Sequence, residues 1–262
     1  MTQNNAISAY LDPEFASFWN EATGDNGGVY KQYVLNPQLL SEIGTLNGKT
    51  VVDLGCGNGY FSSQIEGQNP DRLILIDISP HNLDFARKRV QTNIAEFIEQ
   101  DVTKPWKIKP NSVDVIFSGF LLNELEEIDF VTSQAFKTLK NGGRFLFAIT
   151  HPVWDLVTYL RGQADGKERT IRGSKGYFSR GYSKFTMDNS KIRDVDVAQK
   201  YQKVYEIEHY QRPISDYFNS LIKAGFVVEK MLEPEVTAEL LEKQPKFPKT
   251  YPIGLVFVSR KP

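Results

Sequence analysis

The 262-residue chain contains a single cysteine, Cys56, and only three histidines. One cysteine can form no internal disulfide, which is typical of proteins from reducing compartments. His81, His151 and His209 have no spacing to one another or to Cys56 that fits a zinc site. We therefore expect neither a disulfide framework nor a bound metal.

The sequence also lacks an excess of charge of one sign and long hydrophobic runs. The 31 Lys and Arg residues balance 32 Asp and Glu residues, so the formal net charge is -1. Such a chain has no overall field to attract nucleic acid or an anionic membrane surface. No run approaches the ~20 apolar residues that span a bilayer, and the first ten residues lack the basic and apolar parts of a signal peptide. We expect a cytoplasmic protein that binds neither nucleic acid nor membrane.

Residues 161–184 depart from this balance, with seven basic residues against two acidic ones and aromatic residues between them. A solvated surface loop is the simplest interpretation of such a segment. A lid that attracts an acidic substrate is a second interpretation. RNA binding is a third, which the neutral charge of the whole chain opposes.

Hydrophobic runs alternate with helical patterns from residue 50 onwards. The runs that predict strands cover residues 50–55, 72–79, 95–102, 113–120, 144–150, 226–232 and 253–259. The helical patterns that follow or separate them cover residues 61–65, 80–90, 127–140 and 214–224. Because several runs are apolar throughout, the strands are expected to be buried on both faces. This order predicts an α/β fold, a Rossmann-like doubly wound sheet.

The remaining segments are expected to cover this core. Helical patterns at 10–20 and 30–44 precede it, and a segment with weak period-2 alternation follows the fifth predicted strand. The predicted units are an N-terminal helical cap (1–47), the core (48–153), an inserted and partly antiparallel cap (154–205) and the rest of the core sheet (206–262).

The segment from Asp53 to Gly59 carries the most informative pattern. An apolar strand ends in an acid, and glycines at 55, 57 and 59 lead into a helix. Glycine lets the backbone turn tightly and approach a ligand without a Cβ atom, and a helix N-terminus offers free N–H groups. Dinucleotide-binding loops read G-x-G-x-x-G, whereas here the acid precedes the glycines and the third glycine comes one residue early.

Two further acids follow predicted strands in the same half of the chain. Asp77 closes the second strand, where doubly wound folds bind a ribose diol. Asp101 follows the third strand and precedes Val102. A turn residue is the alternative interpretation of Asp101.

This arrangement resembles the class I S-adenosylmethionine-dependent methyltransferases, in particular their small-molecule branch. DLGCGNG resembles the first motif of that family, Asp77 its ribose-binding acid, and Asp101-Val102 its adenine-edge pair. DVIFSGFLLNEL resembles its fourth motif and NGGRFLFAI its fifth strand. The likeness covers residues 48–150 and, more loosely, 206–259.

The resemblance implies a seven-stranded sheet whose last strand is antiparallel. It implies S-adenosylmethionine as cofactor, S-adenosylhomocysteine as product, and transfer of the methyl group to O or N of a small-molecule acceptor (EC 2.1.1 class). The same branch suggests a role in secondary metabolism. A nicotinamide-dependent oxidoreductase and a non-catalytic module that binds a cofactor or partner are the alternatives. The sequence gives no oligomeric state.

The family pattern also assigns cofactor contacts to individual positions. The amino-acid end of the cofactor is expected beside Asp53, Gly55, Cys56 and Gly57. The ribose is expected at Asp77, the adenine at Ile78, Asp101 and Val102, and the sulfonium at Ser118 and Phe120.

Acceptor contacts are expected from residues that the family pattern does not fix. His151 and His209 are candidates for accepting a proton from the acceptor, or else are hydrogen-bonded structural histidines. Arg212 would bind a substrate carboxylate or cap a nearby carbonyl. Tyr30 and Tyr33 would close over the cofactor and the substrate or pack the N-terminal helix onto the core.

Overall fold

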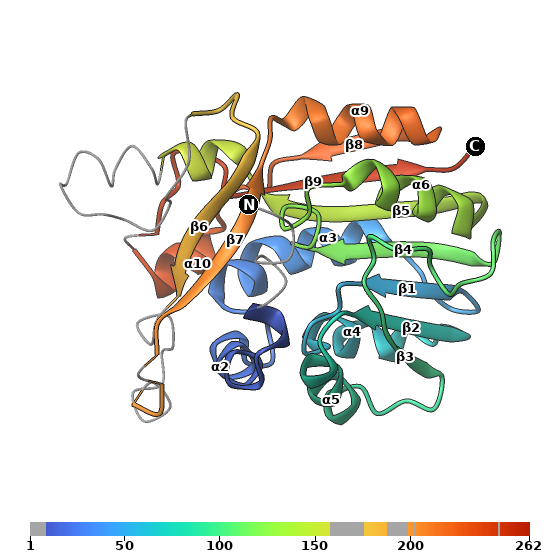
Figure 1. Ribbon diagram of the computed structural model, residues 1–262, viewed down its shortest axis with the longest axis horizontal. Helices are drawn as coiled ribbons and strands as arrows, with labels where there is room; N and C mark the ends of the chain where they lie inside the picture. Colours follow the sequence, from blue (N-terminus) through green and yellow to red (C-terminus); the bar gives the residue numbers. More distant parts are fainter. Residues whose placement is uncertain (1–8, 158–175, 188–198, 202, 246) are drawn as a thin grey trace.

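A seven-stranded sheet forms the centre of the molecule, as the computed structural model shows (Figure 1). The structure describes residues 9–157, 176–187, 199–201, 203–245 and 247–262. The strands of this sheet are β1 (Thr50–Leu54), β2 (Arg72–Asp77), β3 (Ala95–Glu99), β4 (Val113–Gly119), β5 (Leu139–Thr150), β8 (Val227–Leu232) and β9 (Gly254–Arg260). Their order is β3-β2-β1-β4-β5-β9-β8, and β9 is antiparallel to both neighbours. The predicted seven-stranded sheet with an antiparallel last strand is confirmed.

Helices cover both faces of the sheet, which explains the hydrophobic runs of its inner strands. One face packs against α6 (Ile128–Thr138) and α9 (Ile214–Ala224). The other packs against α3 (Asn36–Ile43), α4 (Tyr60–Ile65) and α5 (Pro80–Arg89). Along β1, Val52 lies in the first of these layers and Val51 in the second. Both are fully buried, so neither face of this strand can carry a polar residue cheaply.

The junction between α6 and β5 differs from the predicted one. The helical pattern predicts a helix to residue 140, but α6 ends at Thr138 and Leu139 already pairs with Val113 of β4. The next pair is Val115 with Arg144, so the register shifts between them and residues 140–143 form an irregular stretch inside β5. A Cβ atom at Gly143 would lie 2.8 Å from the carbonyl oxygen of Lys140, so this stretch needs a glycine there.

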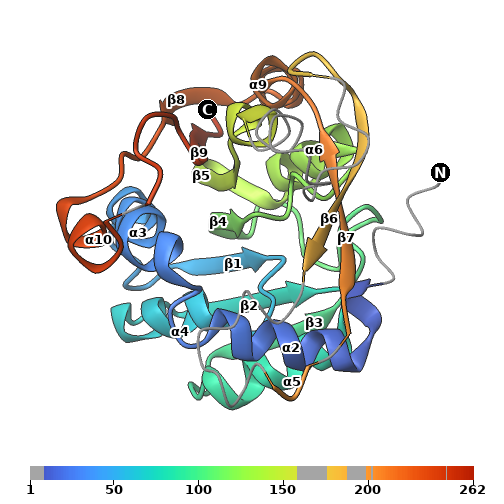
Figure 2. The same ribbon diagram turned by 90° about the vertical axis from the view of Figure 1, so that its left-hand side faces the viewer.

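Residues 9–23 and a small second sheet lie beside the carboxyl edge of the main sheet (Figure 2). Helix α2 (Pro13–Thr23) begins at Asp12, whose carboxylate accepts from the amide of Glu14 at 2.8 Å. The second sheet pairs β6 (Gly181–Met187) with β7 (Tyr205–Gln211) in antiparallel fashion. Phe15 and Phe18 of α2 pack against Tyr205 and Ile207 of β7. Residues 206–211 thus lie in this pair and not in the core sheet to which they were assigned.

Three short elements complete the description. The helical segment 30–44 contains a π-helical turn, η1 (Lys31–Leu35), before α3, and a 3₁₀ turn, η2 (Glu66–Gln68), follows α4. The long connection between β8 and β9 contains α10 (Ala238–Lys243). Among the described residues, no helix is both long and apolar enough to cross a bilayer.

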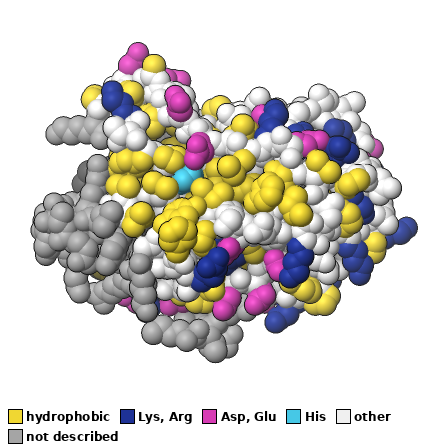
Figure 3. Space-filling view, turned by 90° about the horizontal axis from the view of Figure 1, so that it is seen from above, with side chains coloured by type: hydrophobic (Ala, Val, Ile, Leu, Met, Phe, Trp, Pro, Cys, Tyr) yellow, Lys and Arg dark blue, Asp and Glu magenta, His cyan; other side chains and the backbone are white. Residues whose placement is uncertain are grey.

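The face formed by α9 and β8 exposes several large hydrophobic side chains (Figure 3). They are Phe218 and Ile222 of α9 and Val227 and Met231 of β8. Strand β8 is the edge of the sheet, so this face bounds the molecule on the side away from β3.

The basic segment 161–184 is described only in part, since residues 161–175 lie outside the described residues. Arg180 pairs with both carboxylate oxygens of Asp216 at 2.7 Å. Lys184 pairs with Glu206 at 3.0 Å. The described basic residues of the segment are therefore engaged with acids of α9 and β7.

Candidate active site

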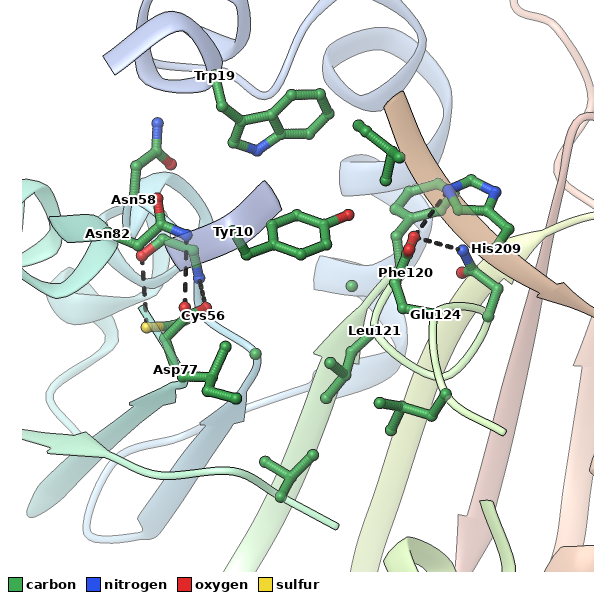
Figure 4. A pocket seen from close by; sticks show the side chains of 18 of the residues that line it. Tyr10, Trp19, Cys56, Asn58, Asp77, Asn82, Phe120, Leu121, Glu124 and His209 are labelled. Atoms are coloured by element: carbon green, nitrogen blue, oxygen red, sulfur yellow. Dashed lines mark hydrogen bonds and ion pairs between the residues drawn. The ribbon is translucent and has the colours of Figure 1, made fainter. Parts of the chain in front are cut away.

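A cavity of about 310 Å³ lies at the carboxyl ends of the parallel strands (Figure 4). Its walls include the residues that directly follow β1, β2, β3 and β4. This is the edge at which open α/β sheets bind their ligands. The predicted cofactor residues that line it are Gly55, Cys56, Gly57, Asp77, Ile78, Asp101, Val102 and Phe120.

The glycine loop after β1 is fixed onto the end of β2. The amides of Gly55 and Cys56 both donate to the carbonyl of Ile76, at 2.8 and 2.9 Å. The amide of Gly57 donates to Asp77 Oδ2 at 2.8 Å. Asp77, the last residue of β2, thereby joins the glycine loop to that strand. The loop and Asp77 both border the cavity.

Asp77 is held rigidly at this point. Its Oδ1 accepts from the amide of Ser79 at 2.9 Å and from Asn82 Nδ2 at 3.4 Å. Burial raises the pKa of the Asp77 carboxyl, against the opposing effect of these hydrogen bonds. A buried carboxylate without hydrogen-bond donors would be costly. The donors around Asp77 offset that cost and also fix the position of its carboxyl group at the cavity wall.

Gly57 and Gly59 both have positive φ angles, 55° and 75°, but their surroundings differ. A Cβ atom at Gly59 would lie 2.9 Å from Cα and Cβ of Ala86 in α5, whereas one at Gly57 would meet no protein atom within 4 Å. Gly59 therefore permits close packing of the loop on α5. Gly57 leaves the space of the cavity open.

We expect these two glycines to respond differently to alanine. Gly59→Ala should lower the free energy of unfolding by about 2–4 kcal/mol, because it adds a backbone clash to the cost of a positive φ angle. Gly57→Ala should cost about 1–2 kcal/mol, for its φ angle alone, but should weaken cofactor binding. Urea denaturation and calorimetric titration of both variants check this. Equal destabilisation would contradict the assignment of the two roles.

Asp53 and Ser118 lie behind the cavity wall and do not line it. Asp53 is 3% exposed and accepts from Ser62 Oγ at 2.6 Å. Ser118 is fully buried and donates its hydroxyl to the carbonyl of Leu54 at 2.8 Å. Both side chains hold the end of β1 in place.

Burial raises the pKa of Asp53 to about 7, with Ser62 opposing the shift and Asp77 adding to it. Between about pH 4 and pH 7 the folded protein keeps a proton that the unfolded chain has lost. The contribution of Asp53 to the free energy of unfolding is therefore fully present below its ordinary pKa of 3.8, and it is lost as the pH rises from there to about 7.

Asp53→Asn removes this titration and is expected to flatten the pH dependence. The free energy of unfolding of the unmodified protein should fall relative to that of the variant between pH 4 and pH 7. Urea denaturation of both proteins across this range measures the difference. A difference that stays constant with pH would show that Asp53 does not titrate as described.

Asp101 and Val102 line the cavity beyond β3, with Gln100 beside them. Asp101 Oδ1 accepts from the amide and the hydroxyl of Thr103, at 2.9 and 2.7 Å. This is a local turn, as the alternative interpretation expected, and it also fixes the carboxylate at the cavity wall.

Phe120 and Cys56 both line the cavity. Phe120 directly follows β4 with a φ angle of 65°, and its amide donates to the carbonyl of Ala148 at 2.8 Å. Such a conformation costs of order 1–3 kcal/mol for a residue other than glycine. Burial, reinforced by Asp77 and Asp53, raises the pKa of the Cys56 thiol, so this cysteine stays protonated and unreactive.

The far half of the cavity contains a group of polar side chains that sequence reasoning did not assemble. Glu124 Oε1 lies 2.7 Å from His209 Nε2 and accepts from Asn123 Nδ2 at 3.0 Å. Tyr10 projects into the cavity with its hydroxyl towards Glu124 (Figure 4). Burial, with the charge of Glu124 adding to it, raises the pKa of the Tyr10 hydroxyl. Glu124 follows β4 and His209 lies on β7, so residues 85 positions apart meet here.

The imidazole of His209 has an unusual environment. Burial disfavours its charged form, but Glu124 and then Asp155 outweigh that effect and raise the pKa of His209. Burial raises the pKa of Asp155 to about 7, against the opposing effect of His209. His209 is thus a group that can take up a proton inside the cavity.

The other predicted acceptor residues lie outside this cavity. His151 Nε2 lies 2.9 Å from Glu233, and burial lowers the pKa of its imidazole. Arg212 donates to the carbonyls of Leu125 and Glu126. These contacts match the structural alternatives stated for the two residues.

The two tyrosines pack against the C-terminal part of the chain. The Tyr30 ring stacks on Phe247 with centroids 6.2 Å apart. The Nζ atom of Lys243 lies over the Tyr33 ring, 5.3 Å from the ring centre. Neither lines the cavity; Tyr10, Trp19, Lys31 and Tyr60 do so instead. The aromatic spacing at 10–20 was the only sequence signal for any of these four.

Comparisons with known proteins agree with this geometry. A family model described as a methyltransferase domain matches residues 46–211, more than half of the chain. An uncharacterized protein of Haemophilus influenzae is 23% identical over 249 residues, which are 93% of this chain and 91% of that protein. Phosphoethanolamine N-methyltransferase 1 of Triticum aestivum is 36% identical over 112 residues, 41% of this chain. The match spans only 22% of the wheat enzyme.

A solved structure gives the same result for the fold. The S-adenosylmethionine-dependent methyltransferase from Mesorhizobium loti superposes with a TM-score of 0.68 at 19% identity, over 91% of this chain and all of that one. The family and the cofactor that the sequence predicted are thus confirmed. The chain belongs to the class I S-adenosylmethionine-dependent methyltransferases.

Proposed function

We propose that the protein transfers the methyl group of S-adenosylmethionine to an oxygen or nitrogen atom of a small-molecule acceptor. One observation carries this proposal. A single cavity holds the glycine loop, Asp77 and Asp101 at one end and the Glu124–His209 pair at the other. The cofactor and a proton-accepting group would therefore border the same space.

The cofactor would lie along the ends of the first four strands. Asp77 would accept hydrogen bonds from the ribose hydroxyls, and Ile78, Asp101 and Val102 would contact the adenine. Gly55 and Gly57 would lie beside its amino-acid end. Phe120 would lie beside the sulfonium, because it directly follows β4 between the two ends of the cavity.

The cavity itself supports a small acceptor. Tyr10 and Trp19 from the N-terminal region and Ile207 from β7 form part of its wall. Together with the loops at the strand ends of the core, side chains from these two parts of the chain surround a space of about 310 Å³. The similar wheat enzyme is named for a small-molecule acceptor, phosphoethanolamine. Secondary metabolism and a cytoplasmic location belong to this proposal on sequence grounds alone.

The chemistry is an in-line displacement at the methyl carbon. The bond from carbon to sulfur breaks with its electrons left on sulfur, and the acceptor's lone pair forms the new bond. Holding the acceptor at near-attack distance and excluding water can supply much of the rate acceleration. The proton of an O–H or N–H acceptor would pass to His209, with Glu124 stabilising the imidazolium. The proposal assigns no proton transfer to His151, which lies outside the cavity.

Incubation with S-adenosylmethionine and pools of small phenols, amines and hydroxy acids tests the proposal. Release of S-adenosylhomocysteine that depends on one pool, with a product heavier by one methyl group, is the expected result. Binding of the cofactor without turnover on any pool would favour the non-catalytic module instead.

A further inference from the structure

Lys31 occupies an unusual position in the cavity wall. Its Nζ lies 4.7 Å from the ring centre of Phe120, 5.3 Å from that of Tyr60 and 5.8 Å from that of Trp19. Each distance is within the range of an attraction between a cation and an aromatic ring. The three rings come from separate parts of the chain, so the fold assembles a cage around this ammonium group.

The cage is built closely around the lysine stem. A Cβ atom at Gly27 would lie 2.6 Å from the Tyr60 ring and 2.9 Å from Lys31 Cδ. Gly27, with a φ angle of 78°, therefore allows the backbone to pass directly over both side chains. Lys31 belongs to η1, a π-helical turn of a kind that is frequent at functional sites.

No carboxylate in the described part of the chain lies within salt-bridge distance of Lys31. The acid that acts on it through space is Glu124, which is already engaged by His209 and Asn123. Burial lowers the pKa of Lys31 to about 8, so the group still carries its charge at neutral pH. Lys31 is partly buried, and a charge that loses part of its hydration without an ionic partner is costly. An anionic ligand in the cavity would offset that cost.

We propose that Lys31 binds an anionic group of the acceptor, a carboxylate or phosphate, while the Glu124–His209 pair faces its reacting O–H or N–H. This inference rests on the proposed function and narrows the acceptor to small acids. Glu124, which lies on the side of the cavity away from Asp77 (Figure 4), is the acid whose charge acts on Lys31. This favours the acceptor over the cofactor as the source of the anion.

Matched neutral and charged probes test this inference. Benzoate and benzamide share a ring that suits the aromatic wall and differ in charge. Ligand-observed NMR titrations of the protein saturated with S-adenosylhomocysteine give both dissociation constants. We expect benzoate to bind at least about tenfold more tightly than benzamide, as a charge-assisted contact would provide. Lys31→Met should remove that preference, and Lys31→Arg should retain it.

A second titration identifies the source of the anion. S-adenosylhomocysteine carries a carboxylate, whereas 5′-methylthioadenosine has none. We expect Lys31→Met to leave the affinity for both within about twofold. Selective loss of S-adenosylhomocysteine binding would assign Lys31 to the cofactor and overturn the inference.

The remaining outcomes are equally distinct. Equal binding of benzoate and benzamide to a protein that binds S-adenosylhomocysteine would overturn the inference but leave the proposed function intact. Failure of the unmodified protein to bind S-adenosylhomocysteine would overturn both.

Discussion

Replacement of Asp77 by alanine is expected to weaken the binding of S-adenosylhomocysteine by about 10- to 100-fold. The carboxylate lines the cavity and is fixed by the amides of Gly57 and Ser79. A carboxylate held in this way can accept two hydrogen bonds from a ribose diol without further ordering. Hydrogen bonds to a charged group contribute about 1.5–3 kcal/mol each, and part of that is lost to desolvation.

Part of the loss would be indirect, because Asp77 also anchors the glycine loop through Gly57. Asp77→Asn separates the two effects in part, since its amide oxygen can still accept from the Gly57 amide while its NH2 group takes the place of the oxygen that accepts from Ser79. We expect this variant to fold with reduced stability and to bind the cofactor with intermediate affinity. Calorimetric titration and thermal unfolding of both variants measure affinity and stability separately.

Asp84→Ala is the matched control for this experiment. Asp84 lies on the exposed side of α5, and within the described ranges its ion pair is with Arg87, at 2.9 Å. Its replacement should leave cofactor affinity unchanged. Unchanged affinity in a folded Asp77→Ala variant would refute the assignment of Asp77 to the ribose.

Replacement of His209 by glutamine is expected to lower kcat by about 10²- to 10⁴-fold, the usual contribution of a general base. The affinity for S-adenosylhomocysteine should change little, because Glu124 and His209 lie in the acceptor half. The measurement requires an acceptor from the pool assay, and the rate of S-adenosylhomocysteine release reports kcat. A loss of less than about threefold would exclude His209 as the proton acceptor.

The pH dependence gives this prediction a second readout. Protonated His209 cannot accept a proton, so the rate should fall as the pH drops through the pKa of its imidazole. Glu124 raises that pKa, as does Asp155. In Glu124→Gln the acidic limb of the profile should therefore move to lower pH. A limb that stays in place would show that another group controls it.

His151→Gln provides the contrast between the two histidines. His151 contacts Glu233 and does not line the cavity. Its replacement should lower the stability of the protein but leave kcat within about threefold. A large loss of kcat would mean that the acceptor reaches beyond the cavity as described.

The cofactor half of the site could be predicted from the sequence because it depends on local order. The strand, the acid and the glycines between 51 and 59 are consecutive, and Asp77 and Asp101 each end or follow a recognisable hydrophobic run. The hydrophobic runs predict the strands, and they therefore also predict the loops that directly follow each strand. The family comparison and the cavity lining agree with that part of the prediction.

The acceptor half could not be predicted in this way because it depends on tertiary contacts. Glu124 meets His209 because β7 lies beside the loop after β4, and the period-2 stretch KVYEIEHY (203–210) predicts no partner for that strand. Lys31 lines the cavity and belongs to a π-helical turn. The hydrophobic periodicity of the sequence does not predict such a turn. Tyr30 and Tyr33 were chosen from the same helix but face α10 and the segment after it.

Calorimetric titration with S-adenosylmethionine, S-adenosylhomocysteine and NADH tests the central claim most directly. We predict saturable micromolar binding of the first two to one site per chain, with no heat from NADH. Absence of binding by either adenosyl compound, or a preference for NADH, would contradict the assignment of the cavity and with it the proposed methyl transfer.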